Sequence, residues 1–235
     1  MEQCVLKKLL SNEAFFDDYL LEYRKRSDKI MTYQNWFLTF ITLALAPLYN
    51  TYVAFVVIAI PTMLLSLYLE KNHSGELITR LFMGSSFMIF TGLIIHQNFG
   101  DIEAHFSAFG LIGILLYYRD WRVITVALIV IALHHLILGY VQTLGVAIYV
   151  FDAENYWELF FLHVGYFLPF IAMMIYLSIW LRREGYDSVL INKHLEAQVE
   201  ERTKELEEKN KKLEKLTFID GLTRIFNRNK FDEIF

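Results

Sequence analysis

The chain has 235 residues and a formal net charge of −4, and 55% of its residues are hydrophobic. A soluble domain of this length would contain about 45–50% apolar residues, so the composition argues against an ordinary soluble protein. The single cysteine, Cys4, excludes an intrachain disulfide and a cysteine-based zinc or iron–sulfur site.

The first 31 residues are polar and amphipathic and do not form a signal peptide, because the first long apolar run begins only near Trp36. Apolar residues recur at helical spacing at Phe15, Tyr19 and Tyr23. This pattern predicts an amphipathic helix on the inner membrane surface or against a partner. A solvated helix that leads into the first membrane span is the alternative.

Six apolar segments follow within residues 32–181, and several approach the roughly 20 residues that cross a bilayer. They are 36–49, 52–69, 78–95, 102–118, 123–144 and 157–181. Lys and Arg flank alternate connections only, as the positive-inside rule requires. The sequence therefore predicts an all-α polytopic membrane protein with six transmembrane helices. We expect it in a bacterial inner membrane with both termini in the cytoplasm.

Five histidines lie in or beside the last four segments: His96, His105, His134, His135 and His163. At 1.5 Å per residue, His134 and His135 should lie about 13–15 Å below the outer end of their helix, and His163 about 9 Å deep. His134 and His135 diverge by about 100° and cannot face the same way. Ionisable groups inside a membrane suggest a functional site. The alternative is a set of packing hydrogen bonds between helices.

Neutral imidazole ligates both metal ions and haem iron. The apolar, aromatic character of the bundle favours b-type haem bound by these five histidines. A copper or zinc ion held by His105, His134, His135 and His163 is the alternative cofactor. The sequence has no C-x-x-C-H motif, so covalently attached haem is excluded.

Residues 182–217 are rich in Glu and Lys and contain a heptad pattern. Val199, Leu206 and Leu213 recur every seven residues, while Arg202 and Lys209 lie on the same predicted seam. This pattern predicts a cytoplasmic parallel coiled coil that is only marginally stable, which suits signal transmission. We expect a homodimer that forms through the transmembrane and coiled-coil helices.

Residues 218–235 contain the run DGLTRIFNRNKF, from Asp220 to Phe231. This run resembles the opening of the GGDEF domain of diguanylate cyclases, typically D-x-L-T-x-L-x-N-R-x-x-F, and the helix before it resembles the signalling helix of that family. The resemblance implies the sensor and linker of a membrane-anchored diguanylate cyclase, truncated at the start of its catalytic domain. This chain would lack the catalytic site, and GTP would bind only the full-length protein.

The membrane region also resembles sensor modules of chemoreceptors and cyclases. The shared features are the pair His105–Phe106, the loop YRDWR at 118–122 and the pair His134–His135. Together the patterns predict a lipid-embedded sensor that controls cyclic di-GMP synthesis from GTP, without nucleic-acid binding. The alternatives are a membrane electron-transfer cytochrome, or a bundle that binds a small molecule through hydrogen bonds from the histidines.

Overall fold

The computed structural model describes residues 13–151 and 155–218, together with residues 220, 222, 223, 225 and 226. These residues form helices and turns without any strand element, in agreement with the all-α prediction. The chain divides into two compact units, Met1–Glu184 and Gly185–Phe235.

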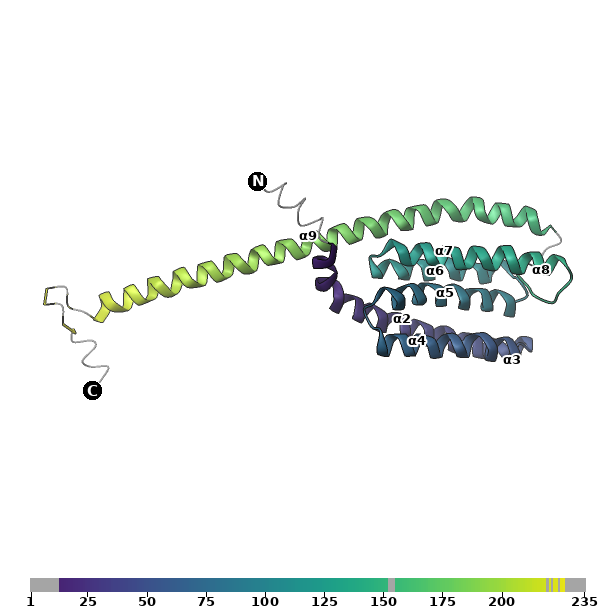
Figure 1. The fold of residues 1–235 in the computed structure, drawn as a ribbon, viewed down its shortest axis with the longest axis horizontal. Coiled ribbons are helices and arrows are strands. Elements are labelled where there is room, and N and C mark those ends of the chain that lie inside the picture. The colour runs from purple at the N-terminus through teal and green to yellow at the C-terminus, as the bar shows by residue number, and fades with distance from the viewer. Residues whose placement is uncertain (1–12, 152–154, 219, 221, 224, 227–235) are drawn as a thin grey trace. The chain divides into compact units, whose positions relative to one another are not determined.

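The first unit is built from apolar helices that lie side by side (Figure 1). In chain order, the elements are α2 (Glu13–Tyr49), α3 (Tyr52–Ala54), the π-helical turn η1 (Phe55–Ala59), α4 (Ile60–Asn72), α5 (Leu77–Gln97), α6 (Ile102–Leu115), the 3-10 turn η2 (Leu116–Tyr118), α7 (Trp121–Leu133), the π-helical turn η3 (His134–Leu138), α8 (Gly139–Thr143) and α9 (Tyr156–Phe218). Helix α9 continues without a break into the second unit.

Helix α2 is one continuous helix from the predicted amphipathic segment through the first predicted span. Arg24, Ser27, Asp28 and Met31 are buried along it, at the i, i+3, i+4, i+7 spacing of a single helical face. This face packs against the rest of the bundle. The charged start of α2 is therefore part of the helical bundle.

Helix α5 lies at the centre of the bundle, with α2 and α4 on one side and α6 and α7 on the other (Figure 1). It is buried along most of its length, and its buried residues include the polar side chains of Arg80, Ser86 and Gln97. Gly84 allows α7 to approach closely, because a Cβ atom there would lie 2.8 Å from the backbone oxygen of Val123.

A buried hydrogen-bond group joins α5 to α2 and α4. The side-chain amide of Asn35 donates to the hydroxyls of Ser66 and Ser86, at 2.8 Å each. The hydroxyl of Ser86 donates back to Asn35 at 3.1 Å. Polar bonds of this kind commonly join helices inside membranes.

In the described part of the chain, four helical stretches are long and apolar enough to cross a membrane: Tyr52–Asn72, Leu77–Gln97, Trp121–Thr143 and Tyr156–Glu214. Ile102–Tyr118 is a shorter apolar helix. The first predicted span, 36–49, lies inside α2, and α2 is not one of these four stretches. The apolar helices agree with membrane association, and the number of six spans stays a prediction.

The second unit contains the remainder of α9. Its predicted heptad residues Leu195, Val199, Leu206 and Leu213 are all exposed. A coiled coil needs a second helix, so the parallel dimer also stays a prediction.

The start of the GGDEF-like run forms a local turn in which the carboxylate of Asp220 accepts hydrogen bonds from the backbone N–H of Leu222 and Thr223. These bonds lower the pKa of Asp220. The predicted motif residues Asn227, Arg228 and Phe231 lie outside the described residues.

Candidate functional site: a histidine cluster beside an apolar cavity

Three of the five predicted histidines come together at the end of the bundle where α6 and α9 begin. His105 lies in the first turn of α6, His135 in η3, and His163 two turns into α9. The ring centroids are 5.1 Å apart for His105 and His163, 5.4 Å for His105 and His135, and 6.3 Å for His135 and His163. We call these three residues the histidine cluster.

All three rings use their Nδ1 atoms in the same way. Each Nδ1 lies near the backbone carbonyl four residues earlier, at 2.9 Å for His105, 2.9 Å for His135 and 3.2 Å for His163. A carbonyl oxygen only accepts hydrogen bonds, so Nδ1 carries the hydrogen of the neutral ring and Nε2 keeps a lone pair. Nε2 of His105 is buried and has no hydrogen-bond partner among the described residues. The cluster therefore offers lone pairs and no hydrogen-bond donor.

A cavity of about 340 Å³ lies beside the cluster, in the size range of small-molecule sites, about 300–1,000 Å³. Apart from the three histidines and Thr91, its wall is apolar. The wall consists of Thr91, Ile95, His105, Ala108, Phe109, Leu128, Ile129, Ile131, Ala132, His135, Phe160, His163, Val164, Phe167 and Leu168.

The other two predicted histidines lie outside the cluster. The His134 ring lies 5.2 Å from that of His135, but it packs against Gly92 of α5, where an added Cβ atom would lie 2.6 Å from the imidazole. His96 accepts a hydrogen bond from the backbone N–H of Tyr149 at 3.3 Å, and the two rings stack. The two adjacent histidines thus face different neighbours, as their spacing requires.

The described residues contain no group of three or more His, Cys, Asp or Glu side chains arranged to hold a metal ion. The set predicted for copper or zinc, His105, His134, His135 and His163, is therefore not preformed as a coordination site. Side-chain movement within the cluster would have to precede ion binding.

The backbone at the histidine pair is irregular. His134–Leu138 is a π-helical turn, a feature that occurs often at functional sites. Tyr156 donates its hydroxyl hydrogen to the carbonyl of His135 and packs closely against Gly139. Tyr156 was not among the predicted site residues, and its place at the start of α9 gave no sign of this contact.

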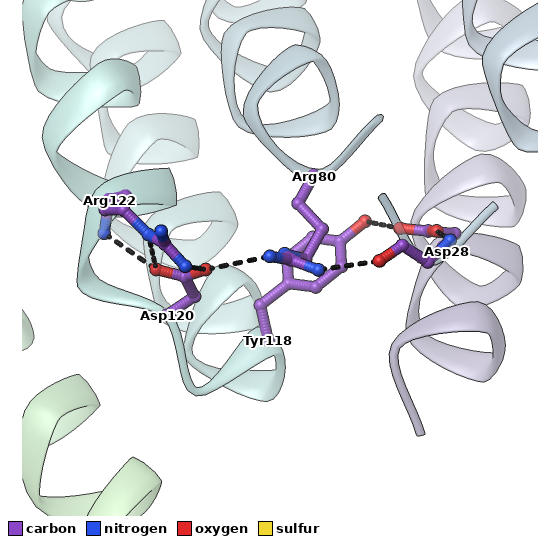
Figure 2. Close-up of polar contacts among 6 residues, drawn as sticks. Asp28, Arg80, Tyr118, Asp120 and Arg122 are labelled. Atoms are coloured by element: carbon purple, nitrogen blue, oxygen red, sulfur yellow. Dashed lines mark hydrogen bonds and ion pairs between the residues drawn. The ribbon is translucent and has the colours of Figure 1, made fainter. Parts of the chain in front are cut away.

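A buried polar group occupies the opposite end of the bundle, and Figure 2 shows its hydrogen bonds and ion pairs. We call Asp28, Arg80, Tyr118, Asp120 and Arg122 the polar cluster. It lies about 20 Å from the histidines along α6, because 13 residues separate His105 from Tyr118.

The two carboxylates join separate parts of the fold. Asp28 accepts hydrogen bonds from the Tyr118 hydroxyl at 2.7 Å and from the Gly75 N–H at 2.6 Å. Arg80 lies 3.3 Å from Asp120 and donates to the Gly75 carbonyl at 2.8 Å. Arg122 makes two further hydrogen bonds to Asp120, at 2.9 Å each. The cluster therefore ties α2 to the α4–α5 turn and to the start of α7.

The pKa values of the two carboxylates shift in opposite directions. Burial raises the pKa of Asp28, against the opposing effect of the hydrogen bonds from Gly75 and Tyr118. Burial alone would also raise the pKa of Asp120, but the hydrogen bonds and charge of Arg122, with the charge of Arg80, hold it below its usual value. Asp28 was not among the predicted site residues, although its place four residues after Arg24, on the same helical face, could have pointed to it.

No family model, curated protein or solved structure matches the chain.

Proposed function

We propose that the chain is the membrane-embedded sensor of a signalling protein and that its histidine cluster binds a Lewis-acidic group. The favoured group is b-type haem, and a copper or zinc ion is the alternative. One observation carries the proposal: three imidazoles lie at the edge of an apolar cavity, and the Nδ1 of each forms a hydrogen bond with a backbone carbonyl oxygen.

The hydrogen bonds of the cluster select the chemistry of its ligand. A carbonyl compound or an anion would need hydrogen-bond donors, whereas the Nε2 atoms of neutral rings supply lone pairs. Metal-ligating histidines typically donate their other N–H to a carbonyl or carboxylate, as these three do. An iron or metal centre is therefore the partner that suits the cluster.

The size and the apolar wall of the cavity favour an organic group over a bare ion. Its volume of about 340 Å³ far exceeds the roughly 30 Å³ that one water molecule occupies in the liquid. Its aromatic and aliphatic wall suits a large apolar ring, and bound haem would supply a centre that responds to redox state or to a gas. His105, His135 and His163 are the residues that would hold it.

Helix α9 supplies the route for the signal. His163 lies on this helix, which continues to Phe218 and carries the heptad residues of the predicted coiled coil. A shift at His163 would change the register or splay of two such helices in a homodimer.

The proposed output of the signal follows from the resemblance to the GGDEF domain: the sensor would control the synthesis of cyclic di-GMP from GTP. The distribution of Lys and Arg supports an inner-membrane location with cytoplasmic termini.

The test is an absorption spectrum of the detergent-purified protein, oxidised and then reduced with dithionite, with metal analysis of the same sample. We expect a Soret band that shifts on reduction. His105→Ala, His135→Ala and His163→Ala should lose or alter it, whereas His96→Ala and the exposed control His194→Ala should retain it.

Other outcomes redirect or refute the proposal. A featureless spectrum with stoichiometric copper or zinc would establish the ion in place of haem. Haem whose reduction leaves cyclic di-GMP synthesis unchanged, in a chain that carries a complete GGDEF domain, would indicate an electron-transfer cytochrome. Absence of haem and metal after supplementation during expression would refute the proposed site.

A further inference from the structure

The ring of Phe151 contacts all three members of the histidine cluster. Phe151 belongs to the connection between α8 and α9, and only 3% of it is exposed. Its ring centroid lies 4.8 Å from that of His163, 5.2 Å from that of His105 and 5.4 Å from that of His135. The rings of Phe151 and His105 are nearly parallel, at 6°. The four rings thus form one packed group.

Phe151 contacts the imidazoles but is not one of the residues that line the cavity. The cavity wall includes all three histidines but not Phe151. Phe151 comes from the α8–α9 connection, whereas the wall residues lie along α5, α6, α7, η3 and α9. The buried phenyl ring therefore covers imidazole surface that the cavity does not reach, and it does so from the α8–α9 connection.

One side chain holds Phe151 in this position. The side-chain oxygen of Gln142 accepts from the backbone N–H of Val150 at 2.7 Å and of Phe151 at 3.3 Å. The amide nitrogen of Gln142 donates to the carbonyl of Phe151 at 2.7 Å. A single glutamine thus satisfies three backbone groups of a segment that has no regular secondary structure.

We propose that Phe151 is the specificity-determining residue of the histidine cluster: it shields the imidazoles from water, so polar ligands reach them only when its ring moves away. Gln142 is the positioning residue that keeps the ring in place. The inference rests on the proposed function only in treating the cluster as a ligand site. The shielding itself depends on contacts among the chain's own residues.

Diethyl pyrocarbonate tests this shielding directly, because this water-soluble reagent acylates unprotonated imidazole nitrogens. The detergent-purified chain is treated without added haem or metal, and modification of each histidine is followed over time by peptide mass spectrometry. We expect His105, His135 and His163 to react at least tenfold more slowly than the exposed His194.

Phe151→Ala should accelerate the reaction at His105 and His163 at least tenfold, and Gln142→Ala should act in the same direction. The matched control is Phe161→Ala, which removes an exposed phenyl ring of α9 and should change nothing. His134, which packs on α5, reports the integrity of the fold. If Phe151→Ala accelerates His134 as well, the variant has unfolded and Gln142→Ala decides the result.

Rates in folded Phe151→Ala equal to those of the unaltered protein would overturn the inference, as would rapid modification of all three histidines in the unaltered protein. The assay needs no bound cofactor. Failure of the proposed haem site would therefore appear in the absorption spectrum and leave the reactivity test decisive.

Discussion

Replacement of Asp120 by alanine should destabilise the protein strongly, because Asp120 is the charged partner of a buried arginine. Asp120 is 1% exposed and Arg80 is 3% exposed. Removal of the carboxylate leaves the Arg80 charge buried. Arg80 then keeps its hydrogen bond to the Gly75 carbonyl, and its Nε already lacks a partner among the described residues. An uncompensated buried charge of this kind costs about 3–5 kcal/mol.

Asp120 also caps α7, since its side chain accepts a hydrogen bond from the backbone N–H of Arg122. Loss of such a cap costs about 1 kcal/mol. The matched control is Arg122→Ala, which leaves Asp120 paired with Arg80. The Arg122 side chain is 33% exposed, so solvent screens its pair with Asp120 and its removal should cost only about 0–1 kcal/mol.

The assay is reversible unfolding in mixed detergent micelles by titration with sodium dodecyl sulfate, followed by circular dichroism. A free energy of unfolding lowered by less than about 1 kcal/mol in Asp120→Ala would refute the reasoning, which rests on an uncompensated buried charge. Equal losses in Asp120→Ala and Arg122→Ala would show that the partly exposed pair carries the stability.

The same pair makes stability depend on pH. The pKa of Asp120 is lower in the folded chain than in the unfolded chain, so its stabilising contribution is present above the unfolded value of about 4. The contribution is lost as pH falls through the lower folded pKa. Asp120→Asn should therefore flatten the decline in unfolding free energy below about pH 4. An unchanged decline would assign it to other carboxylates.

Two further substitutions test the packing inside the bundle. Gly92→Ala places a Cβ atom 2.6 Å from the His134 ring and should lower the free energy of unfolding by about 1–3 kcal/mol. The same unfolding titration measures this loss, and an unchanged midpoint would show that the imidazole moves freely. Asn35→Leu leaves the hydroxyls of Ser66 and Ser86 without their side-chain partner and should lower the free energy of unfolding by about 1–3 kcal/mol. The control is Thr39→Val, at a half-buried position of the same helix. Equal losses in the two variants would refute a special role for Asn35.

Several features follow from the sequence because they depend on local periodicity and composition. Long apolar stretches with few charges predict helices, and the structure is helical there. Helical rise gives the distance of His163 from the start of its own helix, whereas its depth in a membrane stays a prediction. Helical rotation required His134 and His135 to face different neighbours, and they do. Each of these inferences needs only the position of a residue within one helix.

Tertiary structure alone decided which helical faces meet. Periodicity places His96 at the end of its helix but does not show that its ring packs on Tyr149, away from the other imidazoles. The polar cluster joins Asp28 to Tyr118, 90 residues apart, and no local pattern encodes such a pair. The position of Phe151 depends on three backbone bonds from Gln142 in a segment without helical periodicity. The sequence by itself determined the helices and the chemistry of their side chains, whereas the packing of helices against one another selected the three histidines that form the histidine cluster.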